Sequence, residues 1–253
     1  MMRNEKMNMG KISFEKSDYE YPDLEPVADE IASFLYESSS YILGMFIEFM
    51  RTSDKVSLSN YKTFAQKWFS FIKNRKKAAS DIVKLEELCH LFFEVCNKES
   101  EVKKMRGLVP EKLFERVFKK RHSGKDCSIG YGVKVLINGN PIVHRPLNTF
   151  ENKNDSDKNR QTVDAGFWDG NAGEFAEIKL QPHAFQTKDI KYLRVLADEL
   201  CNNSISHTIF LVALGNKDLI RHKLTRLGLI GEENSNEFTL IGKDELFQLG
   251  ITA

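Results

Sequence analysis

The stretch Thr162-Val-Asp-Ala-Gly-Phe-Trp-Asp-Gly-Asn-Ala-Gly-Glu-Phe-Ala-Glu-Ile-Lys-Leu180 decides how the second half of this sequence folds. Residues 162–168 and 174–180 are predicted strands, and the Asp, Gly and Asn residues between them are typical of a hairpin turn. With Gly170-Asn171 as the two turn residues, Asp164 lies opposite Glu177, with the two side chains about 5 Å apart. Lys179 shares their face because side chains alternate along a strand. A slip of one residue in the register would separate the three groups.

Two carboxylates held this close suit a hard divalent cation, and Mg²⁺ is the expected ion, with Mn²⁺ as a substitute. Such an ion lowers the pKa of a bound water and stabilises charge on a phosphate. Lys179 can orient or help to deprotonate the attacking water, or neutralise charge in the transition state. The hairpin therefore predicts a metal-dependent site for phosphodiester cleavage. The other reading of these abundant residue types is an exposed hairpin with a Glu-Lys pair facing solvent.

The segments on either side of the hairpin predict a mixed sheet with helices on its faces. The continuous apolar run at 207–214 has the pattern of a strand buried on both faces. The other expected elements are a helix opened by Val109-Pro110-Glu111 and ending near 121, a strand at 130–137, a turn at 138–140, a long polar loop at 147–161, helices at 187–201 and 217–227, a strand at 238–241 and a final helix from 244.

The first hundred residues have a different texture. Residues 1 to about 22 are an expected irregular lead-in, and apolar residues then recur at helical spacing from Glu25 to about Glu99, with a break at Ser57-Leu-Ser-Asn60. We therefore predict a helical N-terminal domain at 1–100, serving recognition, homodimerisation or docking of a partner protein, and a second domain at 101–253. The helical part contains no motif that indicates a chemistry.

Composition indicates an ordinary globular protein. The 253 residues include 37 Lys and Arg against 36 Asp and Glu, so the net charge of +1 gives no global attraction for nucleic acid. The four cysteines form no Cys-x-x-Cys pair, which argues against a zinc site or a disulfide framework. The N-terminus lacks the apolar run of a signal peptide, and Tyr41–Met50 is too short to span a bilayer. The expected location is the cytoplasm, with no membrane partner.

The segment Val163-Asp164-(x12)-Glu177-Ile178-Lys179 resembles the core motif of the PD-(D/E)xK, or restriction-endonuclease-like, superfamily, with Val163 in place of the usual proline. The resemblance covers roughly residues 101–253 and implies an α/β fold in which a mixed sheet is flanked by helices. It implies catalytic roles for Asp164, Glu177 and Lys179, and metal binding by Asp164, Glu177 and the backbone carbonyl of Ile178. Relatives often place a further acid on the first core helix; Glu115 fits that pattern best, with Glu111, one turn earlier, as its substitute.

Basic residues near the motif are candidates for contact with a phosphate backbone. They are Lys119, Lys120 and Arg121 before the hairpin and Lys188 and Lys191 after it, and Gln181, two residues past Lys179, is expected to border the site. The alternative for the first cluster is a solvated helix face paired with Glu111 and Glu115.

Together these features predict a Mg²⁺-dependent endonuclease that acts on DNA, with a role in restriction or anti-phage defence implied by the resemblance alone. One alternative is a nuclease-fold subunit that binds nucleic acid or a partner protein without cleaving it. Another is a nuclease directed at RNA, since nothing in the sequence separates the two substrates.

Overall fold

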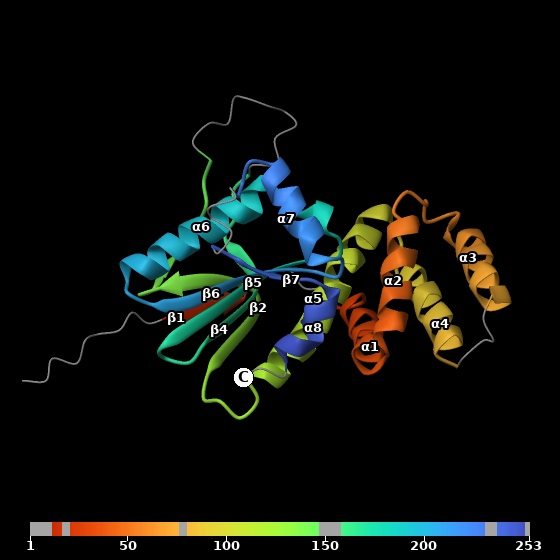
Figure 1. The fold of residues 1–253 in the computed structure, drawn as a ribbon, viewed down its shortest axis with the longest axis horizontal. Coiled ribbons are helices and arrows are strands. Elements are labelled where there is room, and N and C mark those ends of the chain that lie inside the picture. The colour runs from red at the N-terminus through yellow and green to blue at the C-terminus, as the bar shows by residue number, and fades with distance from the viewer. Residues whose placement is uncertain (1–11, 17–20, 76–79, 147–157, 231–236, 251–253) are drawn as a thin grey trace, which may run out of the picture.

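The computed structural model describes residues 12–16, 21–75, 80–146, 158–230 and 237–250 (Figure 1). The first half is helical apart from one short strand, and strands dominate the second half. In chain order the elements are β1 (Ile12–Lys16), α1 (Glu25–Glu37), α2 (Ser40–Thr52), α3 (Tyr61–Arg75), α4 (Ser80–Glu94), α5 (Glu99–Arg121), β2 (Ser128–Ile137), β3 (Asn140–Pro141), β4 (Thr162–Trp168), β5 (Ala172–Lys179), the 3₁₀ turn η1 (Pro182–Ala184), α6 (Thr187–Asn202), β6 (Ser206–Ala213), α7 (Lys217–Arg226), β7 (Thr239–Ile241) and α8 (Lys243–Leu249).

The strands form one mixed sheet of seven strands in the order β1-β2-β4-β5-β6-β7, with β3 paired to β2. The pairs from β1 to β5 are antiparallel, whereas β5, β6 and β7 run parallel. The change follows from the connections, because a tight hairpin joins antiparallel strands and a helical crossover such as α6 joins parallel ones. The predicted mixed α/β sheet is confirmed.

The β4–β5 hairpin has the register expected from its turn. Trp168 pairs with Gly173 and Ala165 with Ala176, which is the last pair of this ladder, and Asp164 and Glu177 come next to that pair on their two strands. The Asp169 carboxylate accepts hydrogen bonds from the backbone N–H groups of residues 171 and 172, at 2.8 and 2.7 Å, which closes the turn. A positive φ of 91° at residue 170 explains the glycine there.

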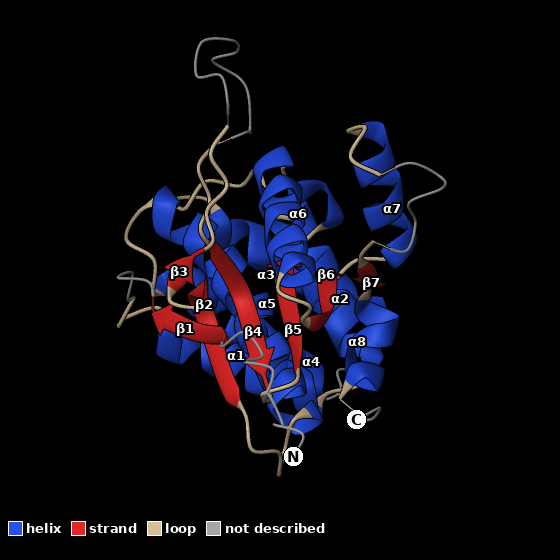
Figure 2. Ribbon diagram, turned by 90° about the vertical axis from the view of Figure 1, so that its left-hand side faces the viewer, coloured by secondary structure: helices blue, strands red, loops and turns tan. Residues whose placement is uncertain are grey.

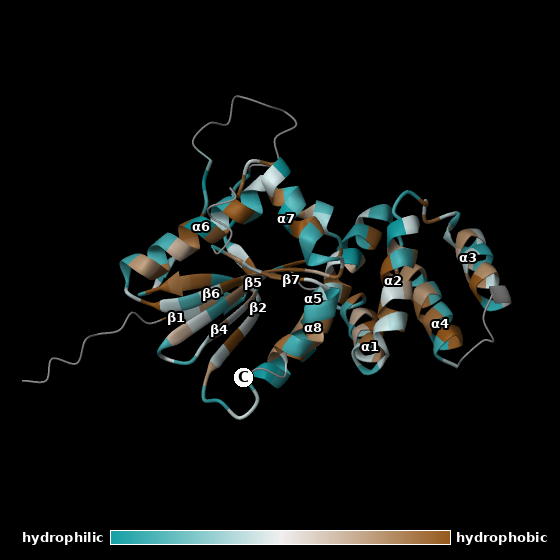
Figure 3. Cartoon of the chain, viewed as in Figure 1, coloured by the Kyte–Doolittle hydropathy of each residue, from teal (hydrophilic) through white to brown (hydrophobic). Residues whose placement is uncertain are grey.

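Helices cover both faces of the sheet (Figures 1 and 2). Helices α6 and α7 pack on one face, where their apolar side chains meet Phe175 and Leu211. Helix α5 lies on the other face against Ala176 and Ile178, and its core continues into α1 to α4. Figure 3 shows hydrophobic residues along β6 and β7, and the buried run at the end of β6 is as expected for a strand covered on both faces.

Three details differ from the sequence-based expectations. Residues 12–16, assigned to an irregular lead-in, form the edge strand β1, whose partner β2 lies more than a hundred residues along the chain and is invisible to local pattern. The helical stretch that begins at Glu25 is broken at Ser38–Ser39, and the Ser39 hydroxyl caps the start of α2. Helix α5 begins at Glu99 and continues through Pro110, because the buried apolar side chains around the proline compensate for its missing hydrogen bond.

The division into domains at residue 100 stays a prediction, although β1 belongs to the sheet while lying in the first hundred residues. Most of the expected polar loop, residues 147–157, lies outside the described residues, as do 1–11 and 17–20 of the lead-in. Within the described part of the chain, no helix has the length and hydropathy needed to span a membrane.

Candidate functional site

The candidate site lies where β4 and β5 meet the start of α6. Asp164 comes from β4, and Glu177 and Lys179 come from β5. The chain enters β4 through Arg160, whose backbone pairs with His144 in an isolated bridge, with N–H to carbonyl distances of 2.8 and 3.1 Å. The sequence-predicted trio is thus brought together, and it is joined by an arginine that the motif does not include.

Asp164 is the most accessible of the acids at the centre, with 14% of its side chain exposed. Its Oδ2 accepts a hydrogen bond from the backbone N–H of Ile178 at 2.7 Å, which fixes the carboxylate against β5. Its Oδ1 lies 3.4 Å from the Arg160 guanidinium, and its Oδ2 lies 3.9 Å from Lys179 Nζ. Asp164 therefore bridges the two strands and also faces the cavity beside them.

Glu177 is fully buried, and its carboxylate is bonded on both sides. Arg160 Nη2 donates to Oε2 at 2.5 Å, and Lys179 Nζ donates to Oε1. Burial raises the pKa of Glu177 to about 8, with Asp164 and Asp189 adding to the rise and Arg160 and Lys179 opposing it. Burial alone would lower the pKa of Lys179, but the carboxylates around its ammonium group raise it, so this lysine is held as a cation.

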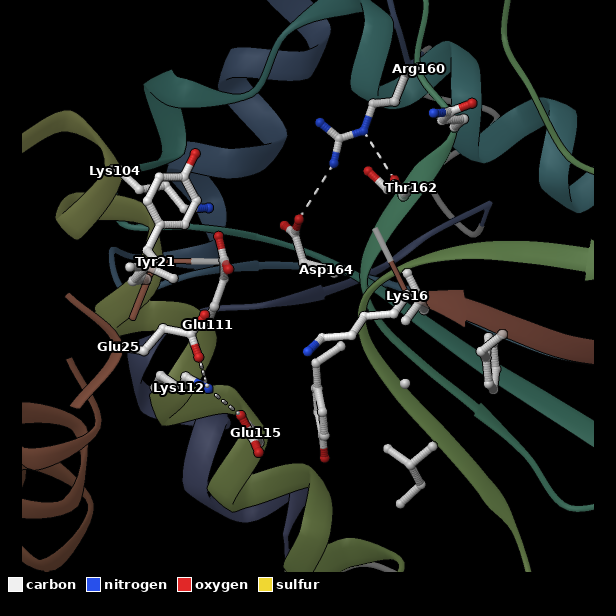
Figure 4. A pocket seen from close by; sticks show the side chains of 18 of the residues that line it. Lys16, Tyr21, Glu25, Lys104, Glu111, Lys112, Glu115, Arg160, Thr162 and Asp164 are labelled. Carbon is white, nitrogen blue, oxygen red and sulfur yellow. Dashed lines mark hydrogen bonds and ion pairs between the residues drawn. The ribbon is translucent and has the colours of Figure 1, made fainter. Parts of the chain in front are cut away.

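Arg160 and Asp189 complete the ion network. Asp189 lies in the first turn of α6, where its Oδ2 accepts the backbone N–H of Gln186 at 3.0 Å in a capping box. Its Oδ1 accepts from Arg160 Nη1 at 2.7 Å. The Arg160 guanidinium thus contacts three carboxylates, and its Nε donates to the carbonyl of Thr162 at 3.2 Å (Figure 4). This side chain ties β4, β5 and α6 together by charge.

Helix α5 brings a further acid toward this network, and that acid is Glu111. Burial raises the pKa of Glu111 to about 7, the Asp164 charge adds to the rise, and Lys104, Lys179 and Arg160 oppose it. Figure 4 shows its side chain pointing from α5 toward Asp164. Glu115 is bonded instead to Lys119, at 2.6 Å, and to Lys112, at 3.4 Å. The placement favours Glu111, the substitute, over Glu115 as the helix-borne acid.

The residues predicted to contact a phosphate backbone are dispersed. Lys188 lines the cavity, while Lys120 and Lys191 are exposed on α5 and α6. Lys119 is occupied by Glu115 and lies 5.7 Å from the centre of the Tyr131 ring. Gln181 lies beyond the end of β5, and its Nε2 is buried without a hydrogen-bond partner among the described residues.

Arg121 is not available for the phosphate contact predicted for it. Its side chain is 16% exposed and donates to both carboxylate oxygens of Glu174, at 2.8 and 2.9 Å, and to the carbonyl of Leu249. The sequence does not show that Glu174, on β5, faces the end of α5, so these bonds of Arg121 could not be expected from it. His122 joins the same cluster through a contact of 3.1 Å between its Nε2 and Glu174. The cluster therefore serves packing of α5 and α8 on the sheet.

The donor chemistry of the central network fits a divalent cation. Asp164, Glu177, Asp189 and Glu111 offer only oxygen atoms, the type of ligand that Mg²⁺ and Mn²⁺ prefer. These four carboxyl groups outnumber the cations Arg160, Lys179 and Lys104 that act on them. In the described residues, however, no three His, Cys, Asp or Glu side chains are grouped to hold a metal ion as they stand. Asp164 and Glu177 would be the first ligands, and their bonds to Arg160 would have to yield.

Two central residues, Arg160 and Asp189, were missed by the sequence analysis. Arg160 could have been found from strand alternation. Side chains two residues apart point to the same face of a strand, so Arg160, Thr162 and Asp164 are expected on one face. Asp189 could have been found from its position in the helix, because an acid at the third position of a helix often accepts a hydrogen bond from the backbone N–H that precedes the helix. Neither signal reveals that the two side chains meet, since that contact depends on how α6 packs against β4.

Comparison with known proteins adds little to this description. No protein-family model matches the chain, and no curated protein matches it. Among solved structures, the chain is similar to the crystal structure of protein VC1899 from Vibrio cholerae, with a TM-score of 0.45 and 12% sequence identity. The similarity covers 95% of this chain and 57% of the other, so the chain spans a little over half of that protein's length.

Proposed function

We propose that this chain is a divalent-metal-dependent nuclease that hydrolyses phosphodiester bonds of DNA. The observation that carries the proposal is that Asp164 on β4 and Glu177 on β5 lie against the same two cations, Arg160 and Lys179. An acidic pair at the edge of a cavity supplies metal ligands, and an adjacent ammonium group supplies charge for a phosphate. Asp164 is partly exposed and Glu177 is fully buried, so a substrate would approach the pair from the side of Asp164.

The order of elements supports a restriction-endonuclease-like core as the finer form of the fold. The helix α5, the antiparallel strands β2, β4 and β5, the helix α6 and the strand β6 follow one another as the PD-(D/E)xK resemblance implies. A role in restriction or anti-phage defence is the part of the proposal that rests on the resemblance alone. Residues 1–100 would then serve recognition, homodimerisation or partner docking.

Each charged group would have a distinct task. Asp164 and Glu177 would hold the cation, with Glu111 and the backbone carbonyl of Ile178 as further ligands. A bound cation supplies Lewis-acid charge and a water of lowered pKa. Lys179, held as a cation by Glu177, would bind and neutralise a non-bridging phosphate oxygen. These tasks need the carboxylates ionised, so metal binding should displace protons from Glu177 and Glu111, whose pKa values are raised without it.

The test is a cleavage assay on purified protein, using single- and double-stranded DNA and RNA with Mg²⁺, Mn²⁺ or EDTA. The variants are Glu177→Gln, which keeps the shape of the buried side chain, and Lys179→Met, which keeps most of its length. We expect wild-type cleavage that requires metal, and a loss of at least a hundredfold in rate in each variant, the scale on which one transition-state contact counts.

The matched control is the Lys73–Glu86 ion pair, which joins α3 to α4. Glu86→Gln and Lys73→Met remove the same groups from a partly buried pair outside the proposed site. They should cleave at the wild-type rate. If Glu177→Gln and Lys179→Met fold, as judged by circular dichroism, and still cleave like the controls, the assignment of the site is wrong.

A binding subunit without cleavage activity is the second candidate, and one observation favours it. The Arg160 guanidinium contacts all three carboxylates and offsets part of their charge without a metal. Tight binding of nucleic acid with no cleavage of any DNA or RNA in Mg²⁺ or Mn²⁺ would select this candidate. Cleavage confined to RNA would instead select the RNA-directed nuclease.

A further inference from the structure

A cavity of about 1060 Å³ opens beside Asp164, and its lining includes aromatic rings and cations that hydrolysis of a phosphodiester does not itself require. Its walls come from β1, the segment before α1, α5, β2 and the residues on either side of Arg160 (Figure 4). These segments are far apart in the sequence and belong to both the helical part and the sheet. A cavity of this size is typical of pockets that enclose a small ligand or a short part of a larger one, and it is too small for an extended binding surface.

Aromatic rings line this cavity at three places. Phe14 comes from β1, Tyr21 precedes α1, and Tyr131 lies on β2. All three are only partly buried. Lys104 Nζ lies 4.8 Å from the centre of the Tyr21 ring, which places a cation next to a ring. The Tyr131 hydroxyl is buried and has no hydrogen-bond partner among the described residues. Rings next to cations are the features that bind unpaired bases and their phosphates.

The charge of the lining differs from that of the whole chain. Among the described residues, six cations line the cavity, namely Lys16, Lys104, Lys112, Arg145, Arg160 and Lys188, against the four acids Glu25, Glu111, Glu115 and Asp164. Lys112 is shared between Glu25 and Glu115, at 3.6 and 3.4 Å, so part of the acid charge is neutralised within α5 and α1. Arg160 is likewise bonded to buried acids, so the cations that would meet a ligand in the cavity include Lys104, Arg145 and Lys188. Such a lining attracts a polyanion.

The position of the acids limits the form of that polyanion. Glu177 has no exposed surface and Asp164 has little, so a phosphodiester must enter the cavity to reach them. The bases of a duplex are already stacked on one another and cannot stack on the rings, whereas those of a single strand can. Gly132, between the pairs Tyr131–Ala165 and Val133–Val163, lines the cavity together with Asp164 and has no side chain to occupy it.

We propose that this cavity binds single-stranded nucleic acid, with bases stacked on Tyr131 and Tyr21 and phosphates held by the surrounding cations. The inference rests on the proposed function for the identity of the polymer, and it names the form of substrate that the site accepts. The strand would lead one phosphodiester past Gly132 to Asp164. DNA and RNA share the chemistry that the cavity recognises, so the experiment compares both.

The experiment measures binding by fluorescence anisotropy in EDTA, so that no cleavage occurs. The probes are a labelled single-stranded DNA of about 20 nucleotides, the RNA of the same sequence, and the DNA duplex, long enough for one site. We expect the single strands to bind at least tenfold more tightly than the duplex, with affinity that falls as salt rises. Tyr131→Leu should weaken single-strand binding by roughly 5- to 150-fold, the range that stacking on one aromatic ring supports.

Tyr41→Leu is the matched control, because Tyr41 lies on α2, is 45% exposed and does not line the cavity. It should bind as the wild type does. Tyr131→Phe retains the ring and should recover most of the affinity that Tyr131→Leu loses. Tyr21→Leu, on the opposite wall, provides the second test if Tyr131→Leu fails to fold.

Equal affinity for the duplex, or less than twofold loss in both folded leucine variants, would overturn this inference. The outcome is separate from that of the proposed function. Single-strand binding that depends on Tyr131, without cleavage in Mg²⁺ or Mn²⁺, would retain the inference and reject the nuclease. Metal-dependent cleavage that depends on Lys179 but is unaffected by Tyr131→Leu would do the reverse.

Discussion

Replacing Arg160 with methionine removes the cation that joins three carboxylates while keeping a side chain of similar length. The guanidinium is 15% exposed and bonds to Glu177 at 2.5 Å and Asp189 at 2.7 Å, both of which are almost fully buried. Its loss leaves these acids with Lys179 as their nearest cation. The substitution therefore tests whether the network holds β4, β5 and α6 together.

The expected cost is about 3–5 kcal/mol of unfolding free energy at neutral pH, the range measured when one partner of a buried ion pair is removed. For a chain of this size that corresponds to a fall in melting temperature of roughly 10 °C. The part of the cost that comes from Glu177 should grow above pH 8. The folded-state pKa of Glu177 is raised to about 8 with Arg160 present, and losing the guanidinium raises it further, so the variant loses stability relative to the wild type once the wild-type carboxyl ionises.

Urea denaturation at pH 7, 8 and 9 measures the effect directly. Arg145→Met is the matched control, because Arg145 is exposed and lines the cavity outside this network, and it should change stability by less than about 0.5 kcal/mol. Added Mg²⁺ should restore part of the loss if it replaces the guanidinium; at a hundred times its Kd it would contribute about 2.7 kcal/mol. A loss in Arg160→Met no larger than in the control, or a loss that does not grow between pH 7 and pH 9, would refute the reasoning.

Three further predictions concern other parts of the molecule. The Arg121 and His122 contacts lower the pKa of Glu174 to about 2 against the opposing effect of burial. The ionised carboxylate therefore stabilises the fold above about pH 4.5, and this contribution is lost as pH falls toward 2. Glu174→Gln should cost about 3 kcal/mol at pH 7, and the denaturation curves of the two proteins should converge toward pH 2. Phe49→Ala removes a ring packed against four other aromatic side chains and should cost about 3–5 kcal/mol in urea denaturation; a loss below 1 kcal/mol would contradict the packing. Gly132→Ala places a side chain at a φ of 59° and should lower stability by about 1–2 kcal/mol, whereas Gly44→Ala in α2, with open space around it, should raise stability by about 0.5–1 kcal/mol; thermal melts showing the opposite order would disprove the account of these two glycines.

The hairpin was predictable because its information is local. The residues from Asp169 to Ala172 specify a two-residue turn, and that turn fixes the register up to Ala165–Ala176, the pair next to Asp164 and Glu177. The order of helices and strands after residue 128 follows from the same kind of local pattern. For these parts of the chain, alternation and turn chemistry determine which residues meet.

The rest of the site depends on packing between distant segments, which local pattern does not encode. Glu111 and Glu115 are one helical turn apart, and the rotation of α5 against the sheet decides which of them approaches Asp164. Arg160 meets Asp189 only because α6 begins beside β4. The continuation of α5 through Pro110 is equally a matter of burial, since the proline alone predicts a helix start.

The pairing of β1 with β2 has a consequence for how the protein is assembled. Ile12 pairs with Ile137, so this contact joins residues separated by most of the helical part of the chain. Contacts of such high sequence separation form late and slow folding, because the entropy of closing the loop is lost before the contact contributes. During synthesis, the apolar side chains of β1 would remain uncovered until β2 has left the ribosome. The helices between them are in effect an insertion between two neighbouring strands, so cutting the chain after the helices would remove an edge of the sheet together with Phe14 and Lys16.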